Sequence, residues 1–154
     1  MAKVGCCSDN NKVNKKDIEN RADIELIVRD FYQLLLADSI VGFIFSDVAK
    51  IDLQSHLPII ADFWSDIVFA NSKAPVTRLY HGNTLQKHLE LNRMIALKPG
   101  HFTRWLYLFS KAVEQKFSGS NADLMKHRAE IVARSISAAI SERKKGDMQL
   151  TLPS

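Results

Sequence analysis

Apolar residues recur along this chain at intervals of three and four, the spacing that puts them on one face of an α-helix. The clearest example is the run Ile24, Ile27, Val28, Phe31, Tyr32 and Leu35. No two alternating apolar runs are joined by the turn residues of a β-hairpin. The pattern predicts five helices, one of them short, over about residues 19–37, 52–69, 83–89, 101–117 and 120–144.

The two ends of the chain lack this periodicity. Residues 1–18 are polar and rich in lysine and asparagine, and residues 146–154 contain a glycine and a proline. Both segments are expected to be flexible tails around a single domain, residues 19–145. The short helix has long connections on both sides, which an up-down bundle does not need. The pattern therefore favours a fold that opens around something large.

Bulk composition is that of an ordinary globular protein, with 46% hydrophobic and 25% charged residues. The longest apolar stretches, residues 39–45 and 57–64, are too short or too interrupted to span a bilayer. The polar N-terminal segment has no apolar region of the kind found in secretory signals. A cytoplasmic protein without a membrane partner is therefore expected.

The net charge of +4 raises the question of a nucleic-acid partner. Much of the excess lies in the two ends, at Lys3, Lys12, Lys15 and Lys16 and at Arg143, Lys144 and Lys145. No predicted helix carries a basic stripe with interleaved aromatic residues, so nucleic-acid binding is not expected.

Polar-tipped aromatic side chains occur on or beside the apolar faces of the predicted helices, at Tyr32, His56, His88 and Trp105. Each has a polar atom that needs a hydrogen-bond partner once buried. Taken singly, each also has a structural interpretation, as a histidine satisfied by backbone or water or as an aromatic side chain in a core. One ligand shared inside the domain would satisfy several of them together.

Haem fits these residues better than zinc. The two cysteines, Cys6 and Cys7, are adjacent in the polar N-terminal segment, and the candidate histidines lack a nearby acid and an HxxxH pair. The cysteines are either a redox-sensing pair or two incidental thiols. Haem needs one imidazole for iron, apolar walls for the macrocycle and hydrogen-bond donors on the opposite side.

The residues that carry this chemistry stand in an order that closely resembles group III truncated haemoglobins. The matching motifs are Phe31-Tyr32, VGFIF at 41–45, His56 before Phe63-Trp64, Tyr80-x-Gly82 with LQKHL at 85–89, and FTRWLYLF at 102–109. The resemblance covers about residues 19–140. It implies an all-α truncated globin fold, a two-over-two helical sandwich enclosing haem b.

The resemblance also implies residue roles. His88 is expected to be the proximal iron ligand, and Tyr32, His56 and Trp105 are expected to face a bound gas. The expected cofactor-binding residues are Phe45, Ile60, Phe63 and Leu85 against the macrocycle, with Arg78, Tyr80 and Arg93 near the propionates. His101 is the alternative iron ligand, but it lies one turn from Trp105 on the same predicted helix and is expected to face the distal side.

Two features depart from the family pattern. The stretch ELNRMIALKPG, residues 90–100, is longer, so the loop after His88 is expected to be remodelled. Pro58 follows His56 by two residues, and proline fits a first helical turn but not an interior. The helix is therefore expected to begin near Ser55 or to bend there, and His56 is expected to swing between pocket and solvent as a gate.

The expected function is a haem-binding globin, a monomer or weak dimer, that reversibly binds O2 and other diatomic gases, including a role in oxygen transport. The alternative is a haem-dependent peroxidase-like or NO-detoxifying redox enzyme that takes electrons from a reductase. A helical interaction domain without a cofactor is the third interpretation.

Overall fold

The computed structural model describes residues 14–70 and 79–150, with side chains described up to residue 146. Within these ranges every regular element is helical: α1 (Arg21–Ala37), the short π-helical η1 (Ile44–Val48), α2 (Leu53–Val68), α3 (Thr84–Met94), α4 (Pro99–Lys116) and α5 (Ser120–Leu150). The all-α prediction is confirmed. None of the helices described is both long enough and apolar enough to cross a bilayer.

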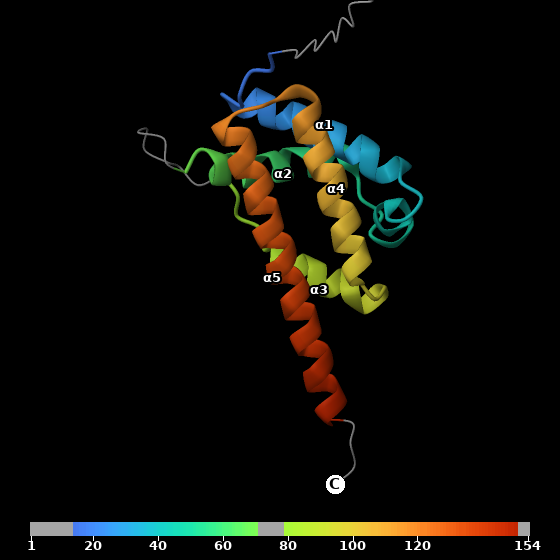
Figure 1. Ribbon diagram of the computed structural model, residues 1–154. Coiled ribbons are helices and arrows are strands. Elements are labelled where there is room, and N and C mark those ends of the chain that lie inside the picture. The colour runs from blue at the N-terminus through green and yellow to red at the C-terminus, as the bar shows by residue number, and fades with distance from the viewer. Residues whose placement is uncertain (1–13, 71–78, 151–154) are drawn as a thin grey trace, which may run out of the picture.

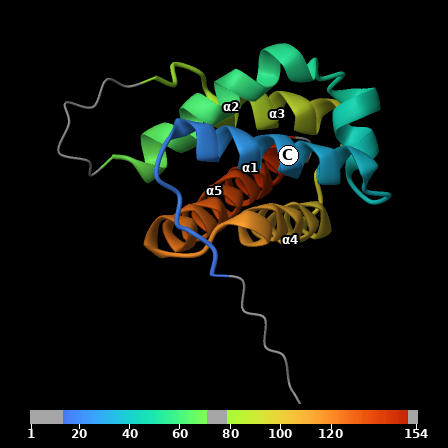
Figure 2. The same cartoon turned by 90° about the horizontal axis from the view of Figure 1, so that it is seen from above.

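The helices form two stacked pairs. α1 packs against α2, and α4 packs against α5 (Figure 1). Seen from above, the α1–α2 pair lies over the α4–α5 pair, and contacts of α1 with α4 and of α2 with α5 join the two layers (Figure 2). α3 lies at the side of this stack and contacts α5. This is the two-over-two arrangement that the sequence predicts.

The centre of the core is a cluster of aromatic rings between the two layers. Phe109 of α4 is fully buried, and its ring centroid lies 5.2 Å from that of Phe31, 4.7 Å from Trp64 and 5.2 Å from Trp105. The apolar face of α1 predicted from the three-and-four spacing is buried, as expected. Trp64 is thus a core residue, whereas Trp105 is partly buried and packs against the core from its edge.

Local signals account for the starts of three helices. Asn20 caps α1 by accepting a hydrogen bond from the N–H of Asp23, and Asn83 caps α3 in the same way from the N–H of Gln86. α4 begins at Pro99, whose missing N–H costs nothing in a first turn. The two asparagine caps explain why α1 and α3 start directly after a polar residue and not at their first apolar residue.

α2 agrees with the helix expected over about residues 52–69, although it does not start as late as Ser55. The helix begins at Leu53, so Pro58 lies in its interior and not in its first turn. Proline has no N–H to give to the carbonyl of Gln54, one turn earlier. Gln54 is exposed, so water is available to that carbonyl, and the helix continues past the proline.

The expected tails also need correction. Residues 14–18 pack on the helices: Ile18 is buried, and the carboxylate of Asp17 accepts hydrogen bonds from the N–H groups of Asn121 and Ala122. At the other end α5 continues through Gly146 to Leu150, although a tail was expected from residue 146. Apolar periodicity ends near Ile140, so it carries no signal for the helical residues that follow, of which 141–146 are exposed. α3 likewise runs to Met94, five residues beyond its expected end at residue 89.

Candidate functional site

His88 of α3 holds one ring nitrogen in a hydrogen bond, and its other ring nitrogen has no partner among the described residues. Its Nδ1 lies 2.8 Å from the carbonyl oxygen of Thr84, one turn earlier. A carbonyl only accepts hydrogen bonds, so the proton is on Nδ1 and the lone pair is on Nε2. No atom of the described residues forms a hydrogen bond with this Nε2.

The environment of His88 also favours the neutral ring. Burial lowers the pKa of His88, and the hydrogen bond to the Thr84 carbonyl raises it by less. Histidines that bind metals donate their second ring N–H to an oxygen in this way, which fixes the tautomer and the ring orientation. His88 is therefore prepared to act as a ligand through Nε2.

Tyr32 of α1 and His56 of α2 form a hydrogen-bonded pair. The phenol oxygen lies 2.8 Å from Nε2 of His56, and the two rings meet edge to face at 5.4 Å. Burial raises the pKa of Tyr32. Burial also lowers the pKa of His56, with a smaller contribution from the positive charge that His88 carries when protonated. Both partners are therefore neutral near pH 7.

His56 belongs to α2 and His88 to α3, and the charge of a protonated His88 contributes to the lowered pKa of His56. Neither ring belongs to a metal site built from the described side chains alone. In the described part of the chain, no three His, Cys, Asp or Glu side chains are close enough to hold an ion together. An iron bound here would therefore need a ligand set supplied mainly by its own cofactor.

Trp105 of α4 contributes an indole N–H to the candidate site. Its ring stacks on Phe109 at 5.2 Å with an angle of 11° and meets the edge of Phe31 at 5.4 Å. The structure records no hydrogen bond from its Nε1–H to any described residue. Rings packed on two sides fix the indole, so its N–H is a donor with a defined direction.

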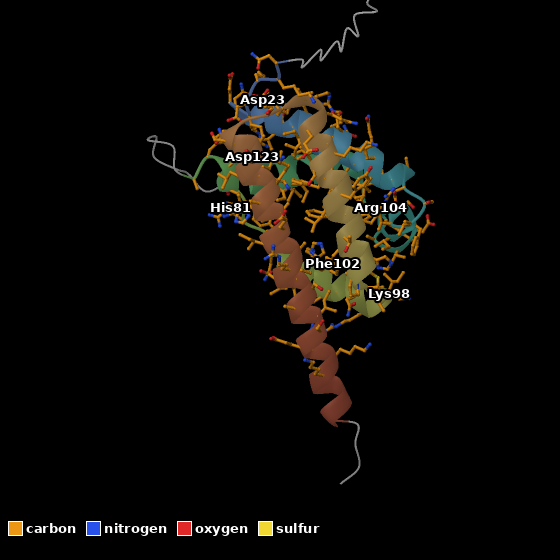
Figure 3. All side chains as sticks on the ribbon, in the orientation of Figure 1. Asp23, His81, Lys98, Phe102, Arg104 and Asp123 are labelled. Atoms are coloured by element: carbon orange, nitrogen blue, oxygen red, sulfur yellow. The ribbon has the colours of Figure 1, made fainter. Side chains whose placement is uncertain are left out.

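Arg104, which the sequence analysis missed, fixes the helix that carries Trp105. Its guanidinium donates to the nearly buried carboxylate of Asp38 at 2.7 Å, and it also lies 5.0 Å from the ring centroid of Tyr107. Figure 3 shows Arg104 on the side of α4 that faces the segment after α1. Pairing between residues so far apart in sequence leaves no periodic signal.

The residues expected along the macrocycle differ in exposure. Phe45, Ile60 and Phe63 are partly buried and pack against the core, whereas Leu85 is 43% exposed. Phe45 meets the ring of Tyr32 at 6.4 Å. Phe45, Ile60 and Phe63 thus lie at the edge of the core.

The residues expected near the propionates are placed as follows. Arg93 is exposed in the last turn of α3, and the hydroxyl of Tyr80 shares a hydrogen bond of 2.9 Å with that of Thr84. Arg78 lies outside the described residues, as do Cys6 and Cys7.

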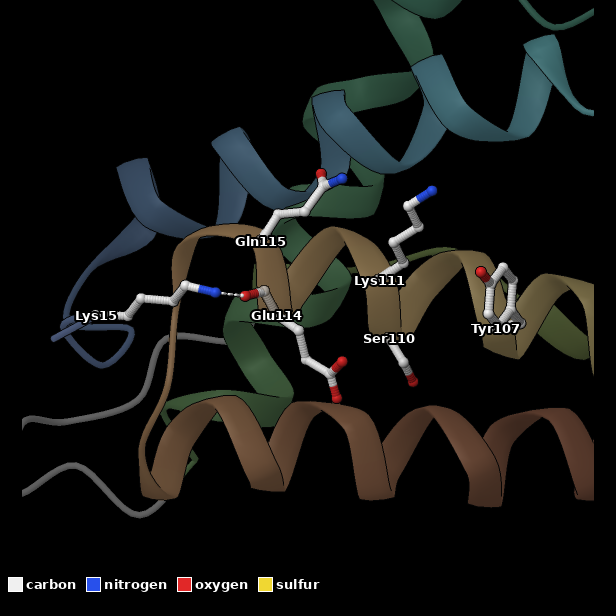
Figure 4. A pocket seen from close by; sticks show the side chains of 6 residues that line it. All are labelled: Lys15, Tyr107, Ser110, Lys111, Glu114 and Gln115. Carbon is white, nitrogen blue, oxygen red and sulfur yellow. Dashed lines mark hydrogen bonds between the residues drawn. The ribbon is translucent and has the colours of Figure 1, made fainter. Parts of the chain in front are cut away.

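The remaining histidines have other positions. Nδ1 of His101 accepts a hydrogen bond from the N–H of Lys98, so this ring helps to cap α4. His81 and His127 are exposed. A recess elsewhere, on the outer side of α4, is lined by Lys15, Tyr107, Ser110, Lys111, Glu114 and Gln115 (Figure 4). It brings none of the candidate residues together.

The fold has a counterpart of known structure. No protein-family model matches the sequence, and no curated protein matches it. The structure is similar to the crystal structure of group III truncated hemoglobin from Campylobacter jejuni, with a TM-score of 0.67 and 22% sequence identity over 82% of this chain and 94% of that one. The resemblance drawn from the sequence is thus confirmed at the level of the fold, and this chain has the fold of a truncated globin.

Proposed function

We propose that this protein binds haem b through His88 and uses it to bind O2 and other diatomic gases reversibly. The observation that carries the proposal is the state of His88, whose Nδ1–H is held by the Thr84 carbonyl while Nε2 has no partner among the described residues. When bound, haem supplies a ferrous iron at which a diatomic gas binds. Nε2 of His88 would hold that iron from the α3 side.

The opposite side of the pocket would be formed by Tyr32, His56 and Trp105. Neutral His56 has a single ring proton. With that proton on Nε2, His56 donates to the phenol oxygen, and the Tyr32 proton is free to donate to the gas. The Nε1–H of Trp105 would be the second donor. A hydrogen bond worth about 1.5 kcal/mol slows escape of the gas roughly tenfold.

Apolar and basic residues would complete the cofactor site. Phe45, Ile60, Phe63 and Leu85 would contact the macrocycle, and burial of the cofactor would cover the exposed part of Leu85. Arg78, Tyr80 and Arg93 would bind the propionates, by charge or by hydrogen bond.

Absorption spectroscopy of the purified protein with added haem tests the proposal. We expect a Soret band in the wild type and a spectrum without the histidine-ligated form in His88→Ala. His101→Ala and His127→Ala are the matched controls, and both should retain the wild-type spectrum. A wild-type protein that shows no Soret band contradicts the proposal, and loss of the histidine-ligated form in His101→Ala but not in His88→Ala moves the ligand to α4.

The peroxidase-like alternative has less support. A carboxylate hydrogen-bonded to the proximal imidazole would favour it, because such a partner increases the electron density on the ring. In the described residues the partner of Nδ1 is the neutral carbonyl of Thr84, and the carboxylate of Glu90 accepts from Gln86 instead. Reversible gas binding is therefore the function that we propose.

A further inference from the structure

Helix α3 carries His88 but buries little of its apolar surface against the rest of the protein. Leu91 is the one buried side chain of its 11 residues, all of which are described. Apolar burial is the main source of helix placement in a globular protein. The position of His88 therefore depends on other contacts at the start of α3.

A carboxylate on α2 anchors the residues that lead into α3. Asp66 accepts hydrogen bonds from the N–H of Leu79 at 3.0 Å and from the N–H of Tyr80 at 2.8 Å. Hydrogen bonds to an ionised carboxylate are about twice as strong as bonds between neutral groups. The backbone at Tyr80 is thus tied to the last turns of α2.

The side chain of Tyr80 extends this anchor to the first residue of α3. Its ring packs edge to face on Phe63 at 5.1 Å and covers Gly82 so closely that a Cβ there would lie 2.5 Å from the tyrosine oxygen. Its hydroxyl is 2.9 Å from Oγ1 of Thr84. The glycine thus leaves the space in which Tyr80 reaches Thr84.

Thr84 joins this contact to the candidate iron ligand. Its side chain bonds to Tyr80, and its carbonyl oxygen accepts the Nδ1–H of His88 at 2.8 Å. A restraint on Thr84 is therefore a restraint on the imidazole one turn later.

We propose that Tyr80 is a positioning residue that acts through Thr84 to hold the ring of His88 in one orientation, with Asp66 fixing Tyr80 in turn. The proposal rests on the proposed function, because it gives His88 the role of iron ligand. It is separate from a propionate contact of Tyr80, since the tyrosine keeps its own proton for a propionate when the Thr84 hydroxyl donates to the tyrosine oxygen.

The test compares variants that remove or keep the hydroxyl contact. Tyr80→Phe removes one hydroxyl and keeps the ring on Phe63, and Thr84→Val removes the other while keeping the carbonyl. Tyr107→Phe, on an exposed tyrosine, and Thr84→Ser, which keeps a hydroxyl, are the matched controls. The double variant completes a cycle that measures whether the two hydroxyls act together.

Two readouts are needed. In the haem-free protein, nitrogen NMR of the His88 ring should show one tautomer in the wild type and doubled or broadened signals in Tyr80→Phe and Thr84→Val. In the haem-loaded protein, transfer of haem to an excess of a haem-scavenging protein should be about tenfold faster in both variants, and no faster again in the double variant. Both controls should match the wild type, and helix content by circular dichroism should be unchanged throughout.

Three results overturn the proposal. In the first, Tyr80→Phe behaves like Tyr107→Phe in both readouts. In the second, haem is lost faster while the His88 signals stay unchanged, which shows that the hydroxyl acts at the edge of the haem. In the third, the effects of the two single variants add in the double variant, which shows that the hydroxyls act separately. A wild type that takes up no haem contradicts the proposed function instead, and the NMR of the haem-free protein still decides the positioning role.

Discussion

At the scale of single residues, the positions of protons decide which side chains of the candidate site can donate hydrogen bonds. Tyr32 and His56 are both neutral, and one hydrogen bond of 2.8 Å joins them. Trp105 has an N–H without a partner among the described residues. In the proposed site these side chains would be the two hydrogen-bond donors to a gas, with Trp105 aligned by ring packing and Tyr32 by its bond to His56.

Substitution of Tyr32 by Phe tests the first donor. We expect the O2 dissociation rate to rise roughly tenfold, because a hydrogen bond worth about 1.5 kcal/mol is lost while the ring stays. Stopped-flow displacement of O2 by CO measures this rate, and Tyr107→Phe is the control because its hydroxyl lies on the surface. An unchanged rate in Tyr32→Phe would show that the phenol does not contact the gas.

The residue types of the site were predictable from the sequence, but their contacts were not. A phenol, two imidazoles and an indole on or beside apolar faces stand out in a periodic pattern, since a core has no use for unpaired polar tips. The contacts of Tyr80 with Thr84 and of Asp38 with Arg104 follow from tertiary placement. The sequence does not show which polar residues of the connecting segments contact one another, because those contacts form only when the helices pack.

At the scale of elements, apolar spacing located the helices because a buried face must repeat with the turn of the helix. The same signal fails where a segment is held by other means. Residues 14–18 show no helical spacing of apolar residues, yet Ile18 is buried. The carboxylate of Asp17 accepts a hydrogen bond from the first turn of α5. Residues 141–146 of α5 are exposed, so their helical state left no trace in the apolar pattern.

Substitution of Asp17 by Ala tests this N-terminal anchor. The carboxylate satisfies the N–H groups of Asn121 and Ala122 in the first turn of α5, so its loss should lower the free energy of unfolding by about 1–2 kcal/mol. Urea unfolding measures the change. Glu130→Ala removes an exposed carboxylate of the same helix and should cost less than about 0.5 kcal/mol. Equal effects in the two variants would mean that Asp17 does not cap α5.

At the scale of the whole molecule, the fold places His56 of α2 and His88 of α3 in surroundings that disfavour charge. Burial is the main cause of the lowered pKa of His56, and it lowers the pKa of His88 by more than the hydrogen bond to Thr84 raises it. The unfolded chain has no such burial, so its histidines titrate near their ordinary value of 6.5. Folding and proton binding are therefore linked.

The haem-free protein should lose stability as the pH falls below 6.5, the ordinary pKa of histidine. When the folded pKa of a histidine is lowered, the unfolded state binds the proton first, so stability is full above 6.5 and declines as the pH falls toward the folded pKa. Urea unfolding at about pH 7.5 and about pH 5.5 measures the loss. His56→Gln and His88→Gln should each reduce it, whereas His127→Gln, on an exposed ring, should leave it unchanged. An equal pH dependence in all three variants would place its origin in groups other than these two histidines.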